Sequence, residues 1–94
     1  YGAKHKIIPV NKKKKSSNKI YEFVGPICES TDKFLTVKKF QNLNENELII
    51  ICDVGAYGSS LSSNYNLRSK PAEILIKNSR IIIAKKRQKL RDFI

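Results

Sequence analysis

The amino-acid sequence predicts an all-β protein: a small Greek-key-like β-barrel or sandwich of about six strands, followed by a short C-terminal helix. Three observations predict this fold class. Short runs rich in isoleucine, valine, tyrosine and phenylalanine recur along the 94 residues. Turn-forming residues separate these runs at intervals of about 8 to 12 residues, the spacing found in small sandwiches and barrels. The hydrophobic periodicity is that of strands throughout, except at the C-terminal end.

Four of the expected strands lie in the N-terminal half. His5–Val10 is a short strand with two central isoleucines. Ile20–Val24 alternates in a way that suits a half-buried strand, and Gly25-Pro26 ends it. Lys33–Phe40 alternates more loosely. Leu48–Cys52 is a continuous apolar, β-branched run, which predicts a strand buried on both faces.

The C-terminal half contains a predicted hairpin. Pro71–Lys77 and Arg80–Lys85 are its strands, and Asn78-Ser79 is its two-residue turn. Ser59–Asn66 is polar and is expected to be extended or looped. Lys86–Ile94 has an apolar side and is expected to form the short helix that closes the chain.

The charge and length limit the function classes. Nineteen basic and eight acidic side chains give a net charge of +11, which suits nucleic-acid binding. The basic clusters at Lys12–Lys15 and Lys85–Arg91 are not interleaved with aromatic residues, however, so a solvated lysine loop is favoured. Since no apolar run is long enough to cross a bilayer and no signal peptide is visible, we expect a cytoplasmic protein without a membrane partner. A large self-contained enzyme is excluded by length.

The cysteines and the missing methionine are also informative. Cys28 and Cys52 lack neighbouring thiols or histidines at metal-ligand spacing, and the chain has one histidine, so no zinc site is expected. Cys52 ends an apolar run, as a core thiol does, whereas Cys28 lies in a turn. The chain starts at Tyr1 and contains no methionine, so we expect it to be part of a longer polypeptide or a processed domain.

Two segments carry side chains suited to chemistry. Gly25–Ser30 presents the thiol of Cys28 beside the carboxylate of Glu29, as a site loop or as an ordinary turn with a surface acid; composition alone favours the turn. Asp53–Ser60 places Tyr57 among small residues after a predicted strand, where its phenol suits a phosphate or carboxylate oxygen, or only covers the core. Neither segment has the pattern of a phosphate-binding P-loop.

In their order and spacing, these and three further segments form a recognisable set. The set is Tyr1-Gly-Ala with His5 and Ile7, then Gly25–Ser30, Asp53–Gly58, Ser62–Asn66 and Pro71–Glu73. It resembles the C-terminal domain of the diaminopimelate decarboxylases, which are pyridoxal 5'-phosphate enzymes of the alanine racemase and ornithine decarboxylase fold type. Ornithine-type relatives carry Cys-Asp where this chain has Cys28-Glu29, which favours the diaminopimelate branch.

The resemblance implies a domain organisation and an activity. Residues 1–94 would be the C-terminal β-barrel domain of a longer decarboxylase, and the (β/α)8 barrel that binds most of the pyridoxal 5'-phosphate would lie outside this chain. The parent enzyme would convert meso-2,6-diaminopimelate to L-lysine and carbon dioxide in lysine biosynthesis. It would be a homodimer with shared active sites, and the 94-residue chain alone would be inactive.

The resemblance also implies roles for four residues. Cys28 would be a catalytic residue beside the cofactor in the partner's site, and Glu29 would hold the distal ammonium group of the substrate there. Tyr57 would contact the cofactor phosphate and the substrate region. Tyr1 would help to bind a substrate carboxylate. The alternatives are a related ornithine- or arginine-type decarboxylase and a small basic β-barrel that binds nucleic acid.

Overall fold

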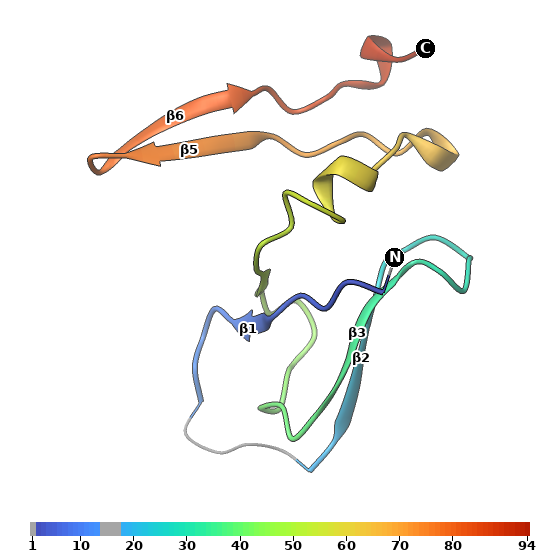
Figure 1. Ribbon diagram of the computed structural model, residues 1–94, viewed down its shortest axis with the longest axis vertical. Coiled ribbons are helices and arrows are strands. Elements are labelled where there is room, and N and C mark those ends of the chain that lie inside the picture. The colour runs from blue at the N-terminus through green and yellow to red at the C-terminus, as the bar shows by residue number, and fades with distance from the viewer. Residues whose placement is uncertain (1, 14–17) are drawn as a thin grey trace. The chain divides into compact units, whose positions relative to one another are not determined.

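The computed structural model describes residues 2–13 and 18–94 (Figure 1). Tyr1 and two members of the lysine cluster, Lys14 and Lys15, lie outside the described residues. The chain divides into two compact units, Tyr1–Ser60 and Leu61–Ile94. Within the described residues there are six strands: β1 (Ile7–Pro9), β2 (Ile20–Val24), β3 (Lys33–Lys38), β4 (Ile49–Ile51), β5 (Glu73–Lys77) and β6 (Arg80–Lys85). They confirm the predicted all-β class, and the described chain contains no α-helix.

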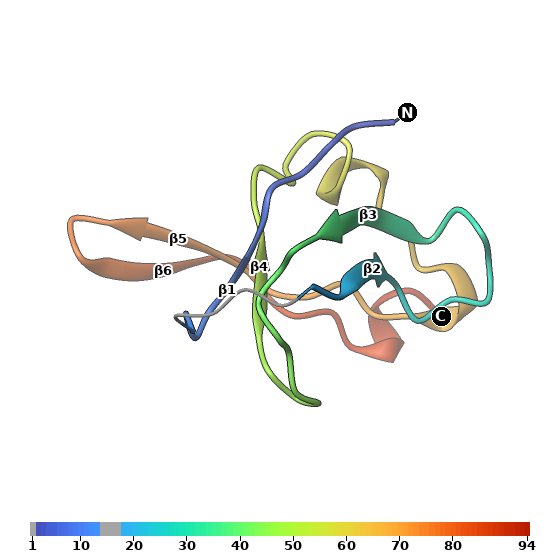
Figure 2. The ribbon, with the colours of Figure 1, turned by 90° about the horizontal axis from the view of Figure 1, so that it is seen from below.

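The first unit consists of two antiparallel strand pairs, one nested inside the other in sequence. The outer pair is β1 with β4, which lie side by side in Figure 2 with Ile7 opposite Ile51. The inner pair is the hairpin of β2 and β3, with Phe23 opposite Leu35. Because β2 and β3 are consecutive in sequence, their connection projects from one end of the hairpin as a single loop. The two segments singled out for chemistry follow β2 and β4 respectively.

Aromatic packing forms the core of this unit. The buried side chains Ile7, Phe23 and Phe40 meet at its centre, with half-buried residues of β2, β3 and β4 around them. The rings of Phe23 and Phe40 pack edge to face with their centroids 5.3 Å apart. Such a pair stabilises a fold by about 0.5–1.5 kcal/mol beyond the area that it buries. The alternating pattern of β2 therefore brings one large ring into the core.

The expectation that Leu48–Cys52 is buried on both faces is wrong. Leu48 and Ile50 are exposed, whereas Ile49 and Ile51 are half-buried and pack against the core. The reason is the two-residue period of a strand, which turns alternate side chains of β4 toward the core and the others away from it. A continuous apolar run does not by itself distinguish one covered face from two.

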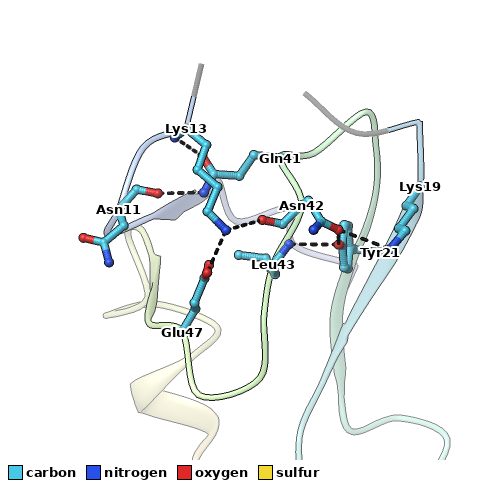
Figure 3. A network of polar contacts seen from close by, with 8 residues as sticks. All are labelled: Asn11, Lys13, Lys19, Tyr21, Gln41, Asn42, Leu43 and Glu47. Atoms are coloured by element: carbon cyan, nitrogen blue, oxygen red, sulfur yellow. Dashed lines mark hydrogen bonds and ion pairs between the residues drawn. The ribbon is translucent and has the colours of Figure 1, made fainter. Parts of the chain in front are cut away.

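A polar network joins Asn11 and Lys13 to the segment that follows Phe40 (Figure 3). The buried Gln41 side chain donates to the Asn11 carbonyl at 2.6 Å and accepts from the backbone N–H of Lys13 at 2.9 Å. The Lys13 ammonium donates to the Asn42 carbonyl at 2.9 Å and pairs with the Glu47 carboxylate at 2.7 Å. One member of the predicted lysine loop is thus held by an ion pair.

The second unit contains the predicted hairpin, β5 and β6, with Ile76 opposite Ile81. Its turn residues Asn78 and Ser79 have φ values of 50° and 64°. Positive φ at both central residues is the geometry of the type I′ turn that favours two-residue hairpins, so this element confirms the prediction. Apolar side chains lie on both faces of the hairpin and are exposed.

At the C-terminus, the helix expected over Lys86–Ile94 is reduced to a single 3-10 turn, η3 (Leu90–Asp92). Gln88 explains the difference. Its backbone N–H donates to the Lys70 carbonyl at 3.1 Å, and its side-chain oxygen accepts from the Lys70 N–H at 2.9 Å. These bonds tie residue 88 to Lys70, and the hydrogen bonds of the 3-10 turn begin only after it. The Asp92 carboxylate then accepts from the Lys89 N–H at 2.7 Å and caps the turn.

Candidate functional site

The connection between β2 and β3 places the predicted thiol and carboxylate at the surface. Cys28, Glu29 and Ser30 are all exposed, at the far end of a loop that begins at Gly25. The Gly25 N–H donates to the Asp32 carbonyl at 2.8 Å, and the Asp32 N–H donates to the Glu29 carbonyl at 3.1 Å. The loop is therefore closed at its base while its tip remains accessible.

A hydroxyl group orients the Glu29 carboxylate. Thr31 Oγ1 donates to Glu29 Oε1 at 2.9 Å. This bond restricts the rotamers of an exposed side chain that otherwise has several. Cys28 is a free thiol, and among the described residues no cluster of three or more histidine, cysteine, aspartate or glutamate side chains is arranged to hold a metal ion. The loop thus presents a thiol and an oriented carboxylate, suited to contact with a cationic group.

The second predicted site loop follows β4 and is tightly folded. Asp53 and Tyr57 have positive φ values of 55° and 60°. The N–H of Ser59 donates to the Val54 carbonyl at 2.5 Å, and the Tyr57 N–H donates to Ser60 Oγ at 3.1 Å. A Cβ atom on Gly58 would lie 2.6 Å from the Val54 carbonyl oxygen, so only glycine fits there. The turn presents the Tyr57 side chain, which is 55% exposed.

His5 supports the start of this second loop. It is 7% exposed, and its Nδ1 lies 3.2 Å from the Cys52 carbonyl oxygen, which can only accept, so Nδ1 carries the hydrogen. The Cys52 N–H in turn donates to the Lys6 carbonyl at 2.8 Å. The imidazole also meets the ring of Phe34 edge to face. The sequence motif that contains His5 does not assign the histidine a role. In the structure, its hydrogen bond holds Cys52, the residue before Asp53.

The polar string Ser62–Asn66 has an internal role in the second unit. Asn64 Nδ2 donates to the Gln88 side-chain oxygen at 2.5 Å and to the Arg68 carbonyl at 2.8 Å. Gln88 is also the residue that bonds to Lys70. Asn64 therefore stabilises the local fold, a role that only its distant partner at position 88 reveals.

The structure places three of the four predicted site residues. Cys28 and Glu29 are neighbours at the tip of one loop, and Tyr57 is on another loop of the same unit. Tyr1 lies outside the described residues. A role for Asp32 was not predicted from the sequence. Its side chain accepts from the Ile27 N–H at 2.8 Å, and its position shortly after the Gly25-Pro26 turn is the feature that could have indicated this role.

Among residues 2–13 and 18–94, no helix is long and apolar enough to cross a bilayer.

A family model and the sequences of known proteins relate this chain to the same group of enzymes. Residues 1–55 match the family model described as "Pyridoxal-dependent decarboxylase, C-terminal sheet domain". A diaminopimelate decarboxylase of Haemophilus influenzae is 35% identical over 92 residues, which are 98% of this chain and 22% of that protein.

Solved structures agree with the sequence relatives. A crystal structure from Aquifex aeolicus is similar with a TM-score of 0.87 and 34% identity, covering 98% of this chain and 23% of that one. The Helicobacter pylori diaminopimelate decarboxylase in complex with L-lysine has a TM-score of 0.80 and 39% identity, covering 98% and 22%. The chain thus spans less than a quarter of the length of these relatives.

Proposed function

This chain belongs to the pyridoxal-dependent decarboxylases and matches their C-terminal sheet domain. We propose that it is the C-terminal part of a diaminopimelate decarboxylase. The full-length enzyme would convert meso-2,6-diaminopimelate to L-lysine and carbon dioxide. The observation that carries the proposal is the surface loop that presents Cys28 beside the oriented Glu29 carboxylate. In this proposal residues 1–94 form the C-terminal domain, and the cofactor-binding barrel belongs to polypeptide that this chain does not span.

The described residues fit part of a pyridoxal 5'-phosphate site. The tight turn after β4 presents the Tyr57 phenol, an O–H donor suited to a phosphate oxygen, and Gly58 leaves the turn without a side chain beside it. When bound, the cofactor acts as the electron sink for the carbon that loses its carboxylate. Tyr57 would hold the phosphate at one edge of the site and Tyr1 would bind a substrate carboxylate.

Glu29 and Cys28 would meet the substrate in different ways. The Glu29 carboxylate would bind the distal ammonium group through a charge-assisted hydrogen bond, and so select a substrate with an amine at its far end. Its Oε1 already accepts from Thr31, which fixes the direction in which the carboxylate faces. Cys28 would lie on the reacting face, where its thiol can hold a proton beside the carbon that loses carbon dioxide.

The exposure of both side chains supports a site that two subunits share. In the described structure the side chains of Cys28 and Glu29 are at the surface. The cofactor-binding barrel beside which they would act is not part of this chain. We place them in the active site of the partner subunit of a homodimer. The 94-residue chain alone would then be inactive.

The first test is an assay of the full-length protein that contains this chain. With pyridoxal 5'-phosphate added, it should release carbon dioxide and L-lysine from meso-2,6-diaminopimelate. Faster release from ornithine or arginine would contradict the substrate assignment. Activity of the isolated 94-residue chain would contradict its role as a domain of a larger enzyme.

Mixed dimers test the shared site. A Cys28→Ala variant is mixed with a second variant that lacks the cofactor-binding lysine in the remainder of the polypeptide. If the loop acts across the dimer, random exchange of subunits restores about a quarter of the wild-type activity, because half of the dimers then carry one intact site. No recovery after verified subunit exchange would show that the loop acts within its own subunit.

A further inference from the structure

One side chain closes the loop that carries Cys28 and Glu29. The Oδ2 atom of Asp32 accepts a hydrogen bond from the backbone N–H of Ile27 at 2.8 Å. Through its backbone, Asp32 also accepts from Gly25 at 2.8 Å and donates to the Glu29 carbonyl at 3.1 Å. Asp32 thus binds the chain on both sides of Cys28.

The residue that holds the loop is more buried than the residues at the tip of the loop. Asp32 and Ile27 are half-buried, whereas Cys28, Glu29 and Ser30 are exposed. Exposed side chains at a loop tip have little packing to fix their position. A carboxylate that accepts from a backbone N–H makes one of the stronger hydrogen bonds in proteins. The direction of the loop tip therefore depends on the bonds at its base. Among the bonds that the described part of the chain forms there, the one to the Asp32 carboxylate can be removed by a substitution without changing the backbone.

The fit between Asp32 and Gly25 is specific. A Cβ atom at position 25 would lie 2.1 Å from Asp32 Oδ2, far inside van der Waals contact. The carboxylate occupies the space that a side chain at position 25 would need. Gly25 thus permits the close approach by which Asp32 reaches the Ile27 N–H.

We propose that Asp32 is a positioning residue, which sets the direction in which Cys28 and Glu29 are presented together. The proposal rests on the function given above to these two residues. It adds that the Asp32 side chain aligns both the Cys28 thiol and the Glu29 carboxylate, so that loss of this side chain affects the roles of both. Asp32 itself contacts neither substrate nor cofactor.

The test compares three variants of the full-length enzyme. Asp32→Ala removes the acceptor and should lower kcat and raise KM for diaminopimelate together, with kcat/KM falling roughly 10²-fold, the effect of a misplacement of about 1 Å. Asp32→Asn keeps a side-chain oxygen and should recover most of the activity. Glu22→Gln breaks an exposed ion pair with Lys33 on the same hairpin and should leave both constants unchanged. If Asp32→Ala fails to fold, Asp32→Glu replaces it, because the longer side chain moves the carboxylate away from the Ile27 N–H.

Double variants distinguish positioning from general loss of structure. If Asp32 acts through Cys28 and Glu29, Asp32→Ala should lower kcat little further in a Cys28→Ala enzyme, and should raise KM little further in a Glu29→Gln enzyme. Fully additive effects would overturn the proposal. Wild-type behaviour of Asp32→Ala, alongside impaired Cys28→Ala and Glu29→Gln enzymes, would also overturn it while leaving the proposed function intact.

Amide hydrogen exchange separates the two proposals when activity does not. In Asp32→Ala the Ile27 N–H should exchange faster, whereas in Glu22→Gln it should not. Faster exchange with unimpaired Cys28→Ala and Glu29→Gln enzymes would confirm the support but overturn the roles given to the two residues. Unchanged exchange in Asp32→Ala would overturn the support itself.

Discussion

Cys28 and Glu29 are neighbours in sequence, but in the proposed site they would offer a substrate different chemistry. The thiol can hold a proton, whereas the carboxylate can bind a cation. Because the loop is closed at its base by backbone bonds and by the Asp32 side chain, either tip residue can be replaced without removing a bond that shapes the loop. Substitutions at the two positions should therefore separate turnover from substrate binding.

The first prediction follows from this difference. In the full-length enzyme, Cys28→Ala should lower kcat with little change in cofactor affinity. Glu29→Gln removes the charge that pairs with the distal ammonium, a loss of about 1.5–3 kcal/mol, so KM should rise roughly ten- to a hundredfold. Steady-state kinetics and cofactor titration measure both. Unchanged substrate affinity in Glu29→Gln would contradict the role of Glu29, and loss of cofactor binding in Cys28→Ala would contradict that of Cys28.

A second residue-scale prediction concerns Glu47. The hydrogen bond from the Lys13 ammonium, together with its charge, lowers the pKa of the Glu47 carboxyl below its ordinary value of 4.5, against a smaller opposing effect of desolvation. A lowered folded-state pKa stabilises the protein above the ordinary pKa, and this contribution is lost as the pH falls through the folded-state value. Lys13→Ala should therefore raise the Glu47 pKa and weaken the dependence of stability on acid pH.

Carbon-detected NMR titration of Glu47 measures this change. Lys12→Ala is the matched control, because it removes the same charge from the neighbouring position and no contact between Lys12 and Glu47 is recorded in the described structure. An equal shift in both variants would show that net charge, and not the Lys13 contact, sets the Glu47 pKa.

At the scale of elements, the sequence predicts best where one local rule decides the conformation. The Asn78-Ser79 turn is such a case, because a two-residue hairpin turn needs residues that accept positive φ. The C-terminal helix is the opposite case. Its apolar spacing allows a helix, but Gln88 bonds to Lys70, a residue far away in sequence, and no local pattern records that bond.

The candidate site shows the same division. Cys28, Glu29 and Tyr57 are predicted as site residues because motif and loop position mark side chains suited to chemistry in a short stretch of chain, and their roles stay predictions. The support by Asp32 and the contact between His5 and Cys52 were not predicted, because they depend on how the backbone folds back on itself. Side-chain bonds to backbone groups leave almost no trace in composition or periodicity.

The hairpin turn gives a prediction about stability. Ser79 has a φ of 64°, a conformation in which a Cβ costs about 1–2 kcal/mol, while glycine costs roughly 0.5–1 kcal/mol more entropy on folding. Ser79→Gly should therefore stabilise the protein by up to about 1.5 kcal/mol. Ser79→Val is the control of opposite sign, because a β-branched side chain is strained at this φ. Thermal unfolding of the full-length protein measures the stability of both variants. Equal melting temperatures for Ser79→Gly and Ser79→Val would contradict the strain at residue 79.

At the scale of the whole molecule, the β5–β6 hairpin is unusual for the surface of a protein of this size. Cross-strand pairing places Ile74 and Ile76 of β5 opposite Ile83 and Ile81 of β6, with Leu75 opposite Ile82. Since neighbouring residues of a strand point to opposite faces, apolar side chains occupy both faces of the hairpin. All six are between 45% and 70% exposed. Exposed apolar strand faces favour association with other chains.

The last prediction follows from these faces and from the share of the relatives' length that this chain spans. In solution by itself, the 94-residue chain should self-associate as its concentration rises, despite a net charge of +11 that opposes association. Replacing one cross-strand pair by Ile76→Lys and Ile81→Glu should reduce the association while keeping an attractive pair in the hairpin. The control is Lys77→Arg with Arg80→Lys, which like the first double variant leaves the net charge unchanged, lies at the neighbouring pair and keeps every apolar side chain in place. Sedimentation velocity over a range of concentrations measures the effect, and equal association of the two double variants would show that the hairpin faces are not its cause.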